Sequence, residues 1–127
     1  MTDLFWPGDD LAGDLMSGPA FLEAMVAVER AWLDSLVDAG IAPQEARASL
    51  ADLIADADTE SIARRAATDG SPVSALVTLL RERSTAATAR WLPRGLTSQD
   101  VVDTALVICA RDVLMRIGDE FTVQVRA

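Results

Sequence analysis

The chain has 127 residues, half of them hydrophobic, and a formal net charge of -9 from 11 basic and 20 acidic side chains. This length suits one domain with its own core. The negative charge argues against nucleic acid as a partner, because phosphates would add like-charge repulsion. The sequence has no histidine, which excludes a Ser-His-Asp or Cys-His site built from this chain. One cysteine forms neither an internal disulfide nor a structural zinc site, so we expect no metal.

The sequence shows no targeting signal. The opening stretch, MTDLFWPGDDLAGDLM, is acidic and lacks the basic start of a signal peptide. No run of about 18 uncharged apolar residues is present, so we expect no membrane span. Cys109 lies in an apolar helical stretch and is expected to be a small buried hydrophobe. A lone cysteine also fits a reducing compartment, and we therefore expect a cytoplasmic protein.

The chain begins with an arm and a long helix. Residues 1–18 combine Pro and Gly with Asp, which predicts an extended arm with turns; its Phe5-Trp6 pair is expected to pack on another surface. From Pro19 the apolar residues recur every three or four positions, which predicts a helix that ends before Gly40. Its inward face consists of Leu22, Met25, Val26, Glu29, Trp32, Leu33, Leu36 and Val37.

Two shorter helices are expected next. Pro43 is suited to open the first of them. Thr59 is suited to cap the second, which continues through Ala67 and is ended by Gly70. The inward residues expected in the helix after Pro43 are Ala46, Leu50, Leu53 and Ile54.

The segment GSPVSALVTLLRERS repeats the same signals, with Ser71 as the cap and Pro72 at the first helical position. A short helical piece at residues 85–91 follows and leads into Pro93. No segment alternates cleanly between apolar and polar residues, so essentially no sheet is expected and the fold class is all-α. The inward residues of the helix after Ser71 are Val73, Leu76, Val77 and Leu80.

The last predicted helix begins at Ser98 and runs to near the end, about 28 residues or roughly 42 Å. A helix with apolar residues on so much of its circumference needs partners on several sides. We therefore expect either the front part of a longer protein or a module that oligomerises, and in neither case a monomer. The apolar residues are Val101, Val102, Ala105, Leu106, Ile108, Cys109, Val113, Leu114, Ile117 and Phe121.

The start of this helix allows two interpretations. With Thr97 as N-cap, Asp100 stands at the third helical position, which is the spacing of a capping box. The same helix end also offers free N–H groups and a partial positive charge. Ser98 could complete an anion site there, with Arg94 adding a positive charge and Gly95 allowing close approach to the backbone.

The segment GLTSQDVVDTALVICARD, with ARW shortly before it, resembles the first signature region of the fumarase/aspartase superfamily. Within that superfamily it is most similar to the 3-carboxy-cis,cis-muconate cycloisomerases. The segments DGSPVSALVTLL and FLEAMVAVERAWLDSLVDAGIAP resemble earlier parts of the same family. The resemblance covers nearly the whole chain but only about the first quarter of a family member.

The resemblance implies an N-terminal helical domain at residues 1–96 and the start of a long central-bundle helix at residues 97–127. It implies a homotetramer that performs cofactor-free lactonisation of a carboxylated muconate in aromatic (protocatechuate) catabolism. Thr97 and Ser98 would hold a carboxylate of this small substrate, with Gln99 and Arg94 as secondary binding residues. The later signature regions, which carry the acid and base groups, are absent from these 127 residues, so the isolated chain is expected to be inactive.

Three positions depart from the family pattern. Pro93 stands where the family has a polar, titratable residue, Ser71 where Asn is usual, and Ala75 where Pro is usual. Proline has neither a side-chain donor nor a charge, so the first departure bears on activity. Two alternatives stay open: a non-catalytic helical interaction module, and a fragment of another lyase of the superfamily, such as an adenylosuccinate lyase.

Overall fold

A computed structural model describes residues 4, 5 and 7–126 of the chain. Within these residues the protein is all-α, with six α-helices, two short 3₁₀ helices and no strand. None of these helices combines the length and the apolar character that crossing a membrane requires. The elements are α1 (Asp9–Ala12), α2 (Gly18–Asp38), η1 (Gln44–Ala46), η2 (Leu50–Leu53), α3 (Asp58–Asp69), α4 (Pro72–Arg83), α5 (Ala86–Trp91) and α6 (Ser98–Arg126).

Helix α2 follows the sequence prediction. The hydroxyl of Ser17 caps it by accepting a hydrogen bond from the amide of Ala20 at 3.2 Å. Gly40 follows its end with a φ of 71°, a left-handed conformation that favours glycine. The inward face is buried as expected, with Leu33 only 1% exposed. Trp32 is the exception, because 36% of it is exposed at the edge of this face.

The prediction of a helix after Pro43 is wrong. The chain instead forms the two single turns η1 and η2, separated by extended residues. The guanidinium of Arg47 donates to the carboxylates of Asp34 and Asp38, so the segment is tied side-on to α2. This arrangement buries the side chains of Ala46 and Leu50 completely, which shows that tertiary contacts override the local helical tendency.

Two further local predictions need correction. Helix α3 begins at Asp58, so Thr59 lies inside its first turn and does not cap it. The Asp58 carboxylate accepts from the amide of Ala55 at 2.7 Å and secures the turn before the helix. In the arm, one helical turn, α1, interrupts the expected extended chain. Phe5 is 88% exposed, and Trp6 lies outside the described residues.

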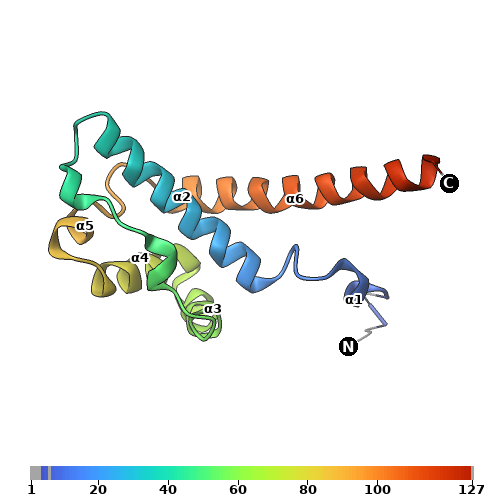
Figure 1. Cartoon of the computed structure of the whole chain (residues 1–127). Helices are drawn as coiled ribbons and strands as arrows, with labels where there is room; N and C mark the ends of the chain where they lie inside the picture. Colours follow the sequence, from blue (N-terminus) through green and yellow to red (C-terminus); the bar gives the residue numbers. More distant parts are fainter. Residues whose placement is uncertain (1–3, 6, 127) are drawn as a thin grey trace.

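The core lies where α2 crosses the first half of α6, with α4 closing one side (Figure 1). Helix α3 packs against α4, and α5 joins α4 to η1. Ser71 and Pro72 start α4 as predicted, and its expected inward residues are buried. Cys109 is buried as expected. The largest completely enclosed side chains are Leu33, Leu50, Leu76, Leu80, Glu29, Val101 and Thr88.

Helix α6 is continuous over 29 residues, which confirms the predicted long helix. Only its first half contributes to the core, through Val101, Ala105 and Cys109. The second half projects away from the other long helices (Figure 1). There Arg116 donates to two carbonyls of the arm, that of Ala12 at 3.3 Å and that of Leu11 at 3.5 Å. The exposed large apolar residues of α6 are Leu106, Val107, Leu114, Met115, Ile117, Phe121, Val123 and Val125.

Candidate functional site

The start of α6 is a complete capping box. The amide and the hydroxyl of Thr97 donate to Oδ2 of Asp100 at 2.8 and 2.7 Å. The amide of Asp100 donates back to the Thr97 hydroxyl at 3.2 Å. The hydrogen bonds from the Thr97 amide and hydroxyl lower the pKa of the Asp100 carboxyl. The hydroxyl proton of Thr97 is therefore committed to the cap, and the capping interpretation of Thr97 and Asp100 describes their geometry.

Ser98 and Gln99 occupy the first two helical positions of α6. Their backbone amides find no acceptor among residues 4, 5 and 7–126, as is usual at a helix start. The side-chain amide of Gln99 donates along the helix to Asp103. Of the side chains predicted to bind a carboxylate, the Ser98 hydroxyl and the Arg94 guanidinium make no hydrogen bond to the described residues.

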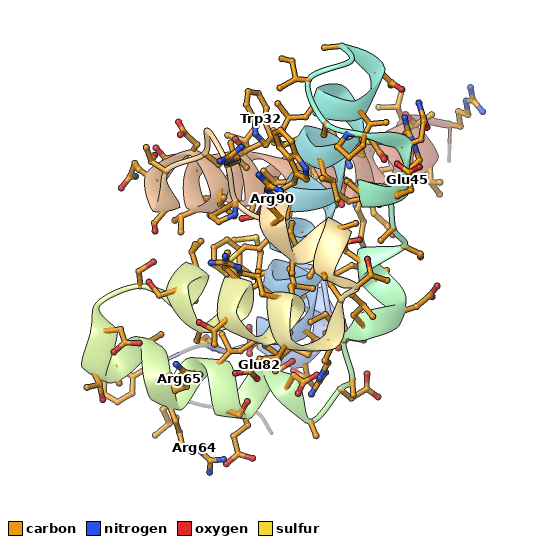
Figure 2. The ribbon with its side chains drawn as sticks, turned by 90° about the vertical axis from the view of Figure 1, so that its left-hand side faces the viewer. Trp32, Glu45, Arg64, Arg65, Glu82 and Arg90 are labelled. Atoms are coloured by element: carbon orange, nitrogen blue, oxygen red, sulfur yellow. The ribbon has the colours of Figure 1, made fainter. Side chains whose placement is uncertain are left out.

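Arg94 and Gly95 serve the turn before α6. The Arg94 guanidinium stacks 4.8 Å from the ring centre of Trp91, and its carbonyl accepts from the Trp32 indole N–H at 2.7 Å. Gly95 has a φ of 86°, and a Cβ there would lie 3.1 Å from the Trp32 ring. The glycine therefore permits the turn and its packing on Trp32. Figure 2 shows Trp32 at the same end of the molecule as Arg90, far from Arg64 and Arg65 on α3.

A small cavity opens beside the start of α6. Its volume is about 140 Å³, enough for a few water molecules at roughly 30 Å³ each or for a carboxylate group. Gln99 and Arg94 do not contribute to it. Helix α2, helix α4, the turn before α6 and α6 itself supply the lining residues Glu29, Val73, Ser74, Val77, Pro93, Leu96, Thr97 and Ser98.

Glu29 is the functional candidate that the sequence analysis missed. It is 1% exposed, on the inward face of α2. No described residue donates a hydrogen bond to either of its carboxyl oxygens. Burial raises the pKa of this carboxyl to about 7, because desolvation disfavours the charged form. The available signal was a carboxyl on an otherwise apolar helix face, since such a group is rarely buried without a partner.

The described residues contain no cluster of three or more His, Cys, Asp or Glu side chains arranged to hold a metal ion. No protein-family model matches the sequence, and no solved structure matches the chain. The start of α6 thus carries backbone amides without an acceptor among the described residues, and its first residue, Ser98, lines the same cavity as the buried Glu29. Such an arrangement suits binding of a small anion or acid.

Proposed function

We propose that this chain is the N-terminal part of a 3-carboxy-cis,cis-muconate cycloisomerase-like enzyme and that it holds a carboxylate of the substrate at the start of α6. The observation that carries the proposal is that the backbone amides of Ser98 and Gln99 find no acceptor among the described residues, and that Ser98 lines a small cavity. The resemblance of the segment from Gly95 to Asp112 supports the choice of family. The protein would act without a cofactor, as a cytoplasmic homo-oligomer.

The proposed chemistry needs a donor array of this kind. In lactonisation, one carboxylate of the muconate adds to a double bond while a proton is delivered to the neighbouring carbon. In the reverse direction, a proton is removed beside a carboxylate, and negative charge accumulates on its oxygens. Fixed N–H donors and the positive end of a helix stabilise that charge. The backbone of Ser98 and Gln99 would supply the donors, with the Ser98 hydroxyl beside them.

The structure changes the roles proposed for the other predicted residues. Thr97 forms the cap, and its hydroxyl can only accept a further hydrogen bond. Arg94 stacks on Trp91, and Gln99 bonds Asp103. Pro93 lines the cavity but provides no proton-transfer group. We therefore assign substrate holding to this chain and assign proton transfer to no residue named in the predicted site, so the isolated chain should show no turnover.

An NMR titration with 3-carboxy-cis,cis-muconate tests the proposal. The amides of Ser98 and Gln99 should shift first, with an affinity in the millimolar range or weaker, since a few charge-assisted hydrogen bonds offset the cost of binding only in part. Ser98→Pro is the decisive variant, because proline is favoured at the first helical position yet removes both the amide and the hydroxyl donor. It should abolish the shifts and leave the helix content unchanged.

Ser35→Ala, an exposed serine of α2, is the matched control and should bind like the parent. Turnover by the isolated chain would contradict the assignment of roles. Shifts that persist in the Ser98→Pro variant, or that fall mainly at Arg64 and Arg65 on α3 (Figure 2), would reduce the start of α6 to a helix cap.

A second candidate, a non-catalytic module that assembles with further copies of itself, is favoured by one observation. The arm and the second half of α6 line an apolar groove of about 560 Å³, which includes Leu11, Met16 and Phe121. Sedimentation of the chain and of an Ile117→Gln/Phe121→Gln variant, both of whose positions line the groove, tests it. Assembly that the double variant removes, combined with no carboxylate shift at Ser98, would favour the module over the enzyme.

A further inference from the structure

The cavity beside α6 is lined both by a buried carboxyl group and by the first residue of α6. The carboxyl group is that of Glu29, and its two oxygens receive no hydrogen bond from any described residue. Ser74, Thr97 and Ser98 belong to the same lining. A buried polar group without a partner is costly to a fold. Glu29 therefore has unused hydrogen-bonding capacity on a residue that lines the cavity.

We infer that this cavity takes up a carboxylate together with a proton: Glu29 is protonated in the complex and donates its O–H to the bound carboxylate, while the amides at the start of α6 donate to the same group. This inference rests on the carboxylate site proposed above and adds a regulator to it. No covalent bond changes. The proton comes from solvent when the ligand binds and returns to solvent when the ligand leaves.

The surroundings favour a carboxylate over a cation. The start of α6 carries the partial positive charge of the helix and presents N–H donors, both of which repel a cation. An ionised Glu29 would in turn repel a bound carboxylate across a cavity of only about 140 Å³. Neither repulsion arises when the ligand is an anion and the Glu29 carboxyl carries a proton.

No other charged side chain lines this cavity. The charged side chains on the helices around Glu29 either bind other residues or are exposed to solvent away from the cavity. Arg81 donates to the carbonyl of Ala89, Arg83 pairs with Asp58, and Glu82 is exposed on α4 (Figure 2). Arg94 covers Trp91, Asp100 belongs to the cap, and Asp103 accepts from Gln99. Arg30, next to Glu29 on α2, lines a different cavity.

This arrangement makes carboxylate affinity depend on pH. The pKa of Glu29 in the unliganded protein is raised to about 7 by burial, and a bound carboxylate raises it further. If only the protonated form binds, the apparent affinity falls with the protonated fraction, by about 30-fold between about pH 6 and about pH 8.5. The affinity should therefore be constant in acid and should weaken about tenfold for each pH step of about one above 7.

Acetate is the probe, because it fits the cavity and stays ionised over this range. Its dissociation constant would be measured by NMR at several pH values for the full chain and for two variants. Glu29→Gln keeps a neutral donor, so it should bind at every pH as tightly as the parent does at pH 6. Glu23→Gln, an exposed glutamate on the same helix, should keep the parent's pH dependence.

A second measurement does not depend on the variants folding. The ¹³C carboxyl signal of Glu29 should titrate near pH 7, and saturating acetate should move its midpoint upward. Affinity that is independent of pH in the parent, or an unmoved Glu29 midpoint, overturns the inference while leaving the carboxylate site intact. Absence of acetate shifts at Ser98 at every pH overturns the proposed site itself, and the inference with it.

Discussion

Two buried carboxyl groups, Asp58 and Glu29, have opposite environments. Asp58 is 7% exposed, and it accepts hydrogen bonds from both terminal nitrogens of Arg83, at 2.6 and 2.9 Å, and from the Ala55 amide. These bonds lower its pKa, that from Arg83 most of all. Glu29 is 1% exposed without a partner in the described chain, and its pKa is raised to about 7. Burial alone therefore does not decide the charge of a carboxyl group; the donors around it do.

The two environments distinguish a carboxyl group that stabilises the fold from one that is available to a ligand. Asp58 joins the start of α3 to the end of α4, and every donor that it needs comes from the fold. The carboxyl group of Glu29 makes no hydrogen bond to any of the described residues. A polar group that costs stability and receives no compensation from its neighbours is a candidate for interaction with a ligand.

The largest expected effect is the dependence of stability on pH that Glu29 imposes. The native carboxyl keeps its proton up to about pH 7, whereas the unfolded one loses it near 4.5. The free energy of unfolding should therefore fall by up to about 3 kcal/mol as the pH rises from about 4.5 through about 7, and should then level off. Urea denaturation of the parent and of Glu29→Gln measures this. The variant should lack that fall, and equal slopes in both proteins would contradict the description of Glu29.

Replacing the partnered carboxyl should cost somewhat less. Asp58→Asn should lower the free energy of unfolding at pH 7 by about 2 kcal/mol, because hydrogen bonds to charged groups contribute about 1.5–3 kcal/mol each and part of this is recovered by water around Arg83. The lowered pKa means that this contribution is present above about pH 4 and is lost in stronger acid. A double-mutant cycle with Arg83→Gln isolates the pair, and additive effects would show that it is not coupled.

A third carboxylate, Asp100, tests the intermediate case of an exposed group bound in a cap. Thr97→Ala removes the hydroxyl that accepts from the Asp100 amide, so stability should fall by about 1 kcal/mol. Thermal denaturation followed by circular dichroism measures it. Gln99→Ala, two residues further along the chain, removes only an exposed hydrogen bond to Asp103 and should change stability much less. Equal losses of stability in both variants would mean that the cap contributes no more than an exposed side-chain hydrogen bond.

The smallest effect is expected at the exposed pair of Glu60 and Arg64 on α3, whose atoms lie 2.9 Å apart. Arg64→Gln should change the free energy of unfolding by no more than about 0.5 kcal/mol, because solvent screens exposed pairs that lie four residues apart on a helix. A loss as large as that in Asp58→Asn, measured under the same conditions, would show that burial does not distinguish the two ion pairs.

The helices predicted best are those with local signals at both ends. Ser71 and Pro72 start α4, and Gly40 ends the turn after α2; each signal works through neighbouring backbone atoms, so the sequence contains it. The segment after Pro43 was mispredicted because Arg47 ties it to two aspartates of α2, a contact that no local pattern records. Asp58 and Thr59 are both good capping types, and no local pattern shows that Asp58 pairs with the distant Arg83.

The same division applies to the candidate site. The spacing of Thr97 and Asp100 predicts their mutual hydrogen bonds, which the structure contains. The cavity could not be predicted, since it combines α2, α4 and α6, which are far apart in the sequence. The helical period does put Glu29 on the inward face of α2, but it cannot show that no described residue donates a hydrogen bond to its carboxyl oxygens. Arg94 was given a binding role because of its charge, whereas the ring of Trp91 beside it decides where its side chain lies.

The unequal covering of α6 has a consequence for hydrogen exchange. Amides near Val101 and Ala105 lie in the core and should exchange with solvent only when the whole domain opens. Amides beyond about residue 113 belong to a helical segment with few buried neighbours, and such a segment opens by fraying from its end. One unbroken helix should thus show a steep gradient of protection along its length. A partner that covers the second half would slow exchange there without altering the amides beside the cavity.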